Sequence, residues 1–303
     1  MSDINSQNSL ELQAYEAMYR ARCFDDTTIA LQRQGAVAGY ASARGQEAAQ
    51  CAVAGSLGPT DIIFPSYRQP GAALVMGVRP VELWRFHGRQ AYCPWNWKQR
   101  RFFAYCIPVG SQLSHAVGWA VARRRLGAED VSVVFFGDGS SSQGEVHEAM
   151  NLAGVLNAPT VFVCENNGWA ISMPTCHQTA ASTLHVRAFG YGFGGARVDG
   201  NDPMAVRHST ETAIRKARAG FGPTLIELVT HRLGGHTTSD NPALYRDEIA
   251  VEQWTARDPV PVLRRRLLAA GCTSEAVGEI EGRVDAQLRA DTEIFLKEIH
   301  PGD

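Results

Sequence analysis

The chain has 303 residues, of which 45% are hydrophobic and 20% charged, with 29 glycines against 14 prolines. This is the composition of a globular protein, and it excludes collagen, coiled-coil and disordered classes. The 29 Lys and Arg residues nearly balance 31 Asp and Glu residues, giving a formal net charge of −2. No summed positive field is therefore available to hold nucleic acid or an anionic membrane, and an anionic ligand needs a local site.

The start of the chain and its cysteines indicate a cellular compartment. No stretch approaches the roughly 18 apolar residues of a membrane span, and the opening MSDINSQNS lacks the basic and apolar regions of a secretory signal. The seven cysteines form an odd set without a CxxC pair and have mostly apolar neighbours. They predict reduced, buried thiols rather than a disulfide framework or a zinc site. We therefore expect a cytoplasmic protein.

The first hundred residues predict a helical start and one short strand. Apolar residues at helical spacing predict a leading helix, with Asn8 and Glu11 placed as a capping box. A small, alanine-rich stretch predicts a tightly packed helix that ends at Gly58-Pro59. The expected elements are a helix over 8–34, a helix over 47–57, a strand over 61–64, and an irregular, aromatic and basic segment over 85–103.

The middle of the chain predicts the sheet. Apolar runs over 131–136 and 160–164 are typical of buried strands, and the segment 144–156 between them has helical spacing. Two buried strands joined by a helix form a βαβ unit, which requires a parallel sheet. Further elements are expected as a helix over 111–126, a strand over 194–198, a helix over 203–219 and a strand over 224–230. The predicted fold class is α/β, with a doubly wound, mostly parallel sheet and helices on both faces.

The remainder of the chain predicts charged amphipathic helices over 250–257, 260–269 and 274–299, with breaks at Pro259 and Gly271. We expect residues 1–303 to form one α/β domain. In this domain, about 1–35 is an N-terminal helical arm and about 250–303 is a C-terminal set of helices.

Two unusual turns follow the two central strands, where ligands of parallel sheets bind. The first, GDGSSS at 137–142, combines glycines that free backbone amides, one carboxylate, and a helix that begins just beyond. The second, ENNG at 165–168, offers amide oxygens. Carboxylate, amide and carbonyl oxygens together suit Mg²⁺ shared with a diphosphate. A single Gly-Asp-Gly is usually only a turn, but the two turns together favour the ligand site.

Several motifs occur in an order that resembles one protein family. The motifs are GQEA (45–48), FPSYR (64–68), PVGSQ (108–112), HAVG (115–118), NNGWAIS (166–172), VDGND (198–202), RLGGHTTSD (232–240) and YR (245–246). Over about residues 10–260 the chain resembles the α subunit of the thiamine diphosphate-dependent first, decarboxylating component of 2-oxo acid dehydrogenase complexes. The branched-chain, pyruvate and acetoin types match alike. The resemblance implies the thiamine diphosphate-binding fold.

The resemblance also implies a set of cofactor residues. Asp138 and Asn167 would ligate Mg²⁺ through their side chains, and Trp169 through its backbone carbonyl. Tyr67 and Arg68 would clamp the diphosphate together with the loop histidine, His236. The other implied cofactor contacts are Ile107, Val109, Gly139, Ser140 and Ala170. Taken alone, Tyr67 is equally a packed aromatic, Arg68 a surface cation and His236 a loop residue.

Two implied catalytic residues and a second cation complete the expected site. In the family, a mobile loop holds His236 over the thiazolium, where it orders the cofactor and can transfer a proton. Glu47 matches an acidic residue near the substrate funnel, although it can equally serve only as a helix cap. Branched-chain relatives bind K⁺ beside the cofactor. That site would fall on Pro108, Ser111 and Gln112.

The resemblance implies that this chain holds half of an active site. Decarboxylation of a 2-oxo acid needs an electron sink, which the thiazolium ring supplies. The aminopyrimidine pocket and its glutamate belong in the family to a separate β subunit, so we expect an α₂β₂ assembly. The acyl group would then pass to a lipoyl-bearing acyltransferase.

Four positions depart from the family pattern. Glu165 stands where many relatives have an arginine, and a carboxylate there repels phosphate, so it must turn away or lower cofactor affinity. Ile107 replaces a serine that touches phosphate. Thr237 replaces a regulatory serine. Trp169 replaces a tyrosine, without consequence if only its carbonyl is a ligand.

These departures leave two alternatives to the dehydrogenase. The first is a carboligase that transfers the acyl carbanion to an aldehyde or ketone without a lipoyl partner. The second is a scaffold subunit that has lost the cofactor. The substrate's side chain is not specified, because pyruvate and branched 2-oxo acids differ by only a few methylenes, worth about 1–3 kcal/mol in binding.

Overall fold

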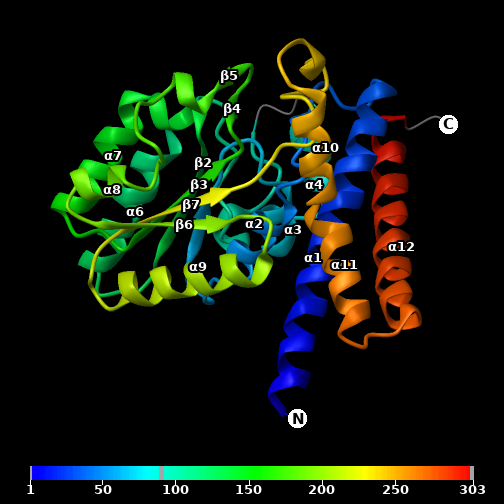
Figure 1. The fold of residues 1–303 in the computed structure, drawn as a ribbon, viewed down its shortest axis with the longest axis horizontal. Helices are drawn as coiled ribbons and strands as arrows, with labels where there is room; N and C mark the ends of the chain where they lie inside the picture. The colour runs from blue at the N-terminus through cyan, green and yellow to red at the C-terminus, as the bar shows by residue number, and fades with distance from the viewer. Residues whose placement is uncertain (1, 89–91, 301–303) are drawn as a thin grey trace.

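The fold is built on one parallel sheet. The computed structural model describes residues 2–88 and 92–300. Five strands pair in parallel in the order β1-β2-β3-β7-β6 (Figure 1). Their bounds are β1 (Ile62–Phe64), β2 (Ser132–Gly137), β3 (Thr160–Asn166), β6 (Gly194–Asp199) and β7 (Thr224–Val229). The predicted α/β class, with a parallel sheet and helices on both faces, is confirmed.

Alternate residues of the strands serve two separate cores. In β2, Val134 and Phe136 join one buried cluster, whereas Val133 and Phe135 join the other, as the period of two in a strand requires. The helices of the first cluster are α6 (Gln112–Arg125), α7 (Gly144–Val155) and α8 (Arg187–Gly190). The helices nearest the sheet in the second are α2 (Glu47–Ala54) and α9 (Pro203–Arg218).

A layer of further helices extends the second core away from the sheet. Helix α1 contacts α3, α11 and α12, and the long helices α1, α11 and α12 lie side by side in Figure 1. The layer comprises α1 (Ser2–Arg33), α3 (Pro70–Val75), α4 (Pro80–His87), α10 (Glu248–Ala256), α11 (Pro259–Ala269) and α12 (Ser274–Ile299). Within 2–88 and 92–300, no helix combines the length and apolar character needed to cross a bilayer.

The winding of the sheet reverses beside its centre. Helices α6 and α7, which precede and follow β2, belong to the first core, whereas α9, between β6 and β7, belongs to the second. The chain leaves β3, passes to the edge strand β6 and returns to β7 next to β3. In open parallel sheets, ligands bind at the carboxyl edge where such a reversal occurs.

The first part of the chain differs from prediction at helix ends. The leading helix begins at Ser2, so Asn8 lies inside it and the predicted capping box is wrong. The next helix ends at Ala54, with Gly55 rather than Gly58-Pro59 at its end. Early ends of this kind come from local backbone hydrogen bonds, which the composition does not reveal.

Short elements were also missed. The segment expected to be irregular holds the end of α4 and the single turn α5 (Trp97–Arg100), whose Asn96 side chain accepts from the Gln99 amide. A two-stranded hairpin, β4 (Trp169–Ala170) and β5 (Met173–Pro174), follows β3. These elements are too short for a periodic pattern, so their caps and pairing define them.

The cysteines are all free, as predicted. Only Cys51 and Cys164 are fully buried, however, and Cys176 is exposed. The expectation of buried thiols was therefore wrong for most of the set.

Candidate functional site

A cavity of about 280 Å³ opens at the carboxyl edge of the sheet. Six parts of the chain line it: residue 46, residues 66–69, residue 109, the turn after β2, the end of β3 with the turn beyond it, and the loop that carries His236. The lining residues that the sequence predicted are Tyr67, Arg68, Val109, Asp138, Gly139, Ser140, Asn167, Trp169, Ala170 and His236. The two turns and the predicted clamp thus meet in one cavity.

The two turns pack directly against each other. A Cβ atom at Gly139 would lie 2.7 Å from the Ala170 Cβ, a contact that side chains do not make. Glycine at 139 therefore lets the first turn approach the second, and this contact fixes the spacing between Asp138 and Asn167.

Asp138 is a buried carboxylate with neutral partners. It is 1% exposed, and its Oδ2 accepts from the Thr175 hydroxyl at 2.9 Å and from Gln178 Nε2 at 3.3 Å. Burial raises the pKa of Asp138, and these two hydrogen bonds oppose that rise. A charged carboxylate in such a place lacks a counter-charge, which a hard cation would supply.

Asn167 is held in a fixed orientation beside it. Its Nδ2 donates to Gln46 Oε1 at 3.2 Å, and its Oδ1 accepts from the Trp169 amide at 3.2 Å. Gln46 is fully buried and lines the cavity too. The carboxylate of Asp138, the amide of Asn167 and the turn at Trp169 together form an oxygen-rich donor set that fits Mg²⁺.

The predicted clamp residues contact one another. Arg68 donates to the His236 carbonyl at 2.8 Å, and its Nη2 lies 3.2 Å from His236 Nδ1. It also donates to the Ser42 carbonyl at 2.6 Å. The Tyr67 ring meets the His236 ring edge-on, with centroids 6.2 Å apart. The clamp is thus already assembled around the histidine.

His236 carries no fixed charge at neutral pH. Burial, and then the charges of Arg68 and Arg232, lower its pKa to about 4. The loop around it is closed by a hydrogen bond from its own amide to Asp240. A neutral imidazole can accept or donate a proton, but the positive charge of the site must come from arginines.

Two buried arginines that the sequence left without a role flank the loop of His236 along the chain, and neither is among the residues that line the cavity. Arg232 is 1% exposed and Arg246 is 9% exposed. Among the residues that the structure describes, each has two guanidinium nitrogens without a hydrogen-bond partner. Burial, followed by the charges of Arg68 and Arg246, lowers the pKa of Arg232 to about 10. Both arginines lie in quoted motifs, but their lack of partners is a three-dimensional property that no spacing reveals.

Glu165 was expected either to turn away from the cavity or to lower cofactor affinity, and its position combines features of both. It borders the cavity, yet its Oε2 accepts from Gln69 Nε2 at 2.6 Å, while Oε1 is buried without a partner. Gln69 in turn accepts from the Ser66 amide at 2.8 Å. Burial raises the pKa of Glu165 to about 7, which reduces its negative charge at neutral pH. Glu165 thereby anchors the segment 66–69 from strand β3.

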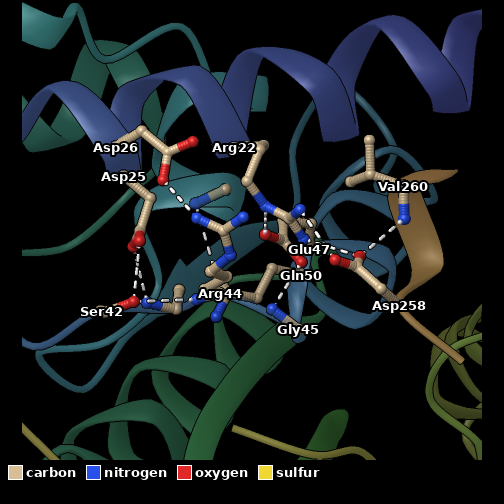
Figure 2. Close-up of polar contacts among 12 residues, drawn as sticks. Arg22, Asp25, Asp26, Ser42, Arg44, Gly45, Glu47, Gln50, Asp258 and Val260 are labelled. Carbon is tan, nitrogen blue, oxygen red and sulfur yellow. Dashed lines mark hydrogen bonds and ion pairs between the residues drawn. The ribbon is translucent and has the colours of Figure 1, made fainter. Parts of the chain in front are cut away.

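Two predicted site residues lie away from the cavity lining. Ile107 is 59% exposed and is not among the lining residues. Glu47 is buried outside the cavity, where it accepts from Arg22 Nε at 2.6 Å and from the Gly45 amide at 2.8 Å (Figure 2). Arg22 also binds Asp258 through both of its terminal nitrogens. Glu47 is therefore part of a buried ion network.

The residues expected around K⁺ are close together, but some of their polar groups already take part in hydrogen bonds within the chain. The Ser111 hydroxyl donates to the Pro108 carbonyl at 3.0 Å. Gln112 donates to the Phe135 carbonyl at 2.7 Å, and its Oε1 is buried without a partner. The potassium site stays a prediction.

Further lining residues were not predicted for the cavity. They are Gln46, Ser66, Gln69, Gln143 and Ile171. Gln46 and Ser66 stand inside quoted motifs, where an amide or hydroxyl beside a predicted ligand was the available signal. Gln143 and Ile171 offered none that distinguishes them from ordinary turn residues.

This fold and site define a class of protein: a doubly wound α/β chain with a polar cavity at the carboxyl edge of its sheet. The family model described as dehydrogenase E1 component matches residues 15–297. The chain therefore belongs to this family, as the resemblance indicated. It is an α subunit of the thiamine diphosphate-dependent, decarboxylating 2-oxo acid dehydrogenase type.

Named relatives agree. The chain is 45% identical over 270 residues to the 3-methyl-2-oxobutanoate dehydrogenase subunit alpha of Mycobacterium tuberculosis, covering 88% of this chain and 72% of that one. It is 36% identical over 275 residues to the mitochondrial 2-oxoisovalerate dehydrogenase subunit alpha of Homo sapiens, covering 87% and 62%. For the mitochondrial 2-oxoisovalerate dehydrogenase subunit alpha 2 of Arabidopsis thaliana, the identity is 33% over 296 residues, covering 94% and 63%.

Proposed function

We propose that this chain serves a branched-chain 2-oxo acid dehydrogenase and binds the Mg²⁺-diphosphate end of thiamine diphosphate. The observation that carries this proposal is the meeting of Asp138, Asn167 and Arg68 in one cavity. The names of the relatives support a branched 2-oxo acid as substrate. They also favour a dehydrogenase over a carboligase or a scaffold.

The metal would be held by the side chains of Asp138 and Asn167 and by the Trp169 carbonyl. The neutral partners of Asp138 support this assignment, because they leave its buried charge uncompensated. A K⁺ ion near Pro108, Ser111 and Gln112 is a secondary proposal, supported by the unpartnered Gln112 oxygen.

The diphosphate would lie against the cationic side of the cavity. Tyr67, Arg68 and His236 would form its clamp, and Gly139 and Ser140 line the same space. Val109 and Ala170 offer apolar contact there. When bound, thiamine diphosphate supplies the electron sink that decarboxylation of a 2-oxo acid requires.

His236 would hold or move a proton at its imidazole. Its low pKa leaves the ring neutral at pH 7, so it can accept a proton as well as orient the cofactor. Glu47 is proposed to support the backbone beside the cavity, because its carboxylate oxygens accept hydrogen bonds from Arg22 and from the Gly45 amide.

A β subunit would complete the site. Four exposed apolar side chains stand on two of the segments that border the cavity, which it meets at Val109 and Ile171: Ile107, Val109, Ile171 and Met173. Apolar groups gathered at the mouth of a polar cavity are typical of a partner surface. In an α₂β₂ assembly the partner would bring the aminopyrimidine pocket and its glutamate, and a lipoyl-bearing acyltransferase would accept the acyl group.

The test is reconstitution with a β subunit. We expect Mg²⁺-dependent binding of thiamine diphosphate by calorimetry, and loss of that binding in Asp138→Ala. We also expect a higher kcat/KM for 3-methyl-2-oxobutanoate than for pyruvate, with reductive acylation of lipoamide. Hydroxyketone formation without acylation would support the carboligase instead. Absence of cofactor binding would leave only the scaffold.

A further inference from the structure

A short segment between α1 and α2 lies along the loop that carries His236. Alternate carbonyls of this segment, residues 40–46, face that loop and the clamp arginine. The contacts are Thr238 amide to Tyr40 carbonyl at 3.0 Å, Arg68 Nη1 to Ser42 carbonyl at 2.6 Å, and Leu233 amide to Arg44 carbonyl at 3.0 Å. The segment is therefore the surface on which the cofactor loop is laid out.

The approach between the two is too close for a side chain. Gly45 has φ of +93°, and a Cβ atom there would lie 2.3 Å from the His231 carbonyl oxygen. The path of the loop is thus set by the backbone of the segment, and whatever fixes the segment also fixes the loop.

One buried carboxylate on α1 fixes the segment from the other side. Asp25 is 1% exposed. Its Oδ1 accepts from the Tyr40 hydroxyl and the Ala43 amide, both at 2.8 Å, and its Oδ2 accepts from the Ser42 hydroxyl at 2.7 Å. Figure 2 shows Asp25 pointing to Ser42, one helical turn from Arg22, which holds Glu47 and through it Gly45.

We propose that Asp25 is a positioning residue for the cofactor loop: it holds the segment 40–46 so that its carbonyls order Arg68 and the loop of His236. The part of this inference that concerns the cofactor rests on the proposed function. The part that concerns the order of the loop stands on the contacts alone. Removing the carboxylate leaves three buried donors without acceptors, which the segment can satisfy only by shifting.

The neighbouring Asp26 is a matched control. It is also an aspartate of α1, but it pairs with the side chain of Arg44 at 2.6 Å, and both side chains are about half exposed. Its removal takes away the same charge one residue along and leaves the backbone of the segment untouched.

Hydrogen exchange of the 303-residue chain without cofactor tests the positioning role. In Asp25→Ala we expect the amides of Leu233 and Thr238 to exchange at least about tenfold faster, the loss of one charged hydrogen bond in local opening. We expect no change in β3 and β7, and none anywhere in Asp26→Ala. Equal effects in both variants, or acceleration spread evenly through the sheet, would overturn the proposal.

Two milder variants keep the test decisive if Asp25→Ala does not fold. Asp25→Asn retains the oxygen that accepts from the Tyr40 hydroxyl and the Ala43 amide, so we expect most of the protection of the loop amides against exchange to return. Ser42→Ala removes one of the three bonds to Asp25, together with the acceptor of the Arg44 amide within the same segment, so we expect faster exchange of the loop amides than in Asp26→Ala. Wild-type exchange in Ser42→Ala would contradict the proposal.

The enzyme assembled with a β subunit provides a separate readout. We expect Asp25→Ala to raise the KM for thiamine diphosphate about tenfold while kcat at saturating cofactor stays near that of the wild type. Asp26→Ala should leave both values unchanged. A fall in kcat alone would contradict positioning of the loop. If the wild-type assembly binds no cofactor, the proposed function fails, whereas the exchange experiment still decides the role of Asp25.

Discussion

The helical layer and the carboxyl edge of the sheet treat buried charge in opposite ways. In and beside the layer, buried carboxylates other than Asp25 have cationic partners: Glu47 of α2 and Asp258 bind Arg22, Asp291 binds Arg79 at 2.7 Å, and Glu11 binds Arg266 at 2.6 Å. At the edge, Asp138 has only neutral donors and Glu165 keeps a bare oxygen, while Arg232 and Arg246 keep bare nitrogens.

The difference distinguishes charged residues that support the fold from charged residues that belong to the site. A buried charge that finds its partner within the chain stabilises a defined structure. Charges left incomplete at the edge of the sheet raise the free energy of the ligand-free protein, and the binding of an ion and an anion lowers it again. Unpartnered buried charge therefore locates the site without reference to any relative.

Among the tests of this contrast, Arg22→Met is expected to have the largest effect. The change leaves Glu47 and Asp258 buried without a cation, so we expect a loss of about 3–5 kcal/mol in the free energy of unfolding. Urea unfolding at pH 7 measures it. Arg20→Met is the control, because Arg20 pairs with Glu16 at the surface, and such pairs contribute about 0.3–0.5 kcal/mol. A loss below 1 kcal/mol for Arg22→Met would show that the network is dispensable.

A second test separates the two turns of the edge. Gly139→Ala places a Cβ atom against Ala170, and we expect a cost of about 1–3 kcal/mol in stability, as for overpacking, with loss of Mg²⁺-dependent cofactor binding. Thermal unfolding and calorimetry measure the two effects. Gly278→Ala in α12 faces open space and should be neutral or slightly stabilising. Normal cofactor binding in Gly139→Ala would refute the close approach.

A third test removes an incomplete charge. Arg232→Leu eliminates bare buried nitrogens, so we expect the cofactor-free chain to gain about 1 kcal/mol in stability while cofactor affinity falls. The Tm with and without cofactor measures both changes. If the variant is destabilised as strongly as Arg22→Met, the proposed contrast between the two regions is wrong.

The smallest change is expected for His231, whose ring stacks on Trp254 with centroids 4.9 Å apart. Burial, and then Arg246 and Arg232, lower its pKa from 6.5 to about 4. Between these pH values the unfolded chain binds a proton at this histidine that the folded chain does not bind. The free energy of unfolding therefore falls as the pH drops from about 6.5 towards 4. His231→Phe keeps the stack and removes this part of the loss. Unfolding midpoints from pH 7 to 4 compare the two, and parallel curves would contradict the assignment.

The regular part of the fold was predictable from local pattern. Strands β2, β3 and β7 are apolar runs, and the turns at the ends of β2 and β3 carry the glycines and amides that indicate a ligand site. Short helices such as α3 and α5 were not, because they depend on caps and packing rather than periodicity. The predicted helix boundaries were wrong for the same reason, because they also depend on caps and packing.

The site was predictable as a set of residues but not as an electrostatic arrangement. Motif order pointed to Asp138, Asn167 and Arg68, which the fold brings into one cavity. The bond between Glu165 and Gln69 joins residues 96 positions apart, and the isolation of Arg232 depends on what surrounds it. Neither is written in local spacing. The motif of Glu47 shows its position along the chain but not its pairing with Arg22, and its place near the substrate stays a prediction.

The contact between Gly139 and Ala170 also suggests how such a site can be redesigned. The distance between the two turns is set by main-chain packing, so the side chains around the cavity are free to vary while that distance is kept. Libraries aimed at other phosphorylated compounds should randomise positions such as 109 and 143 and leave 69, 139 and 170 untouched.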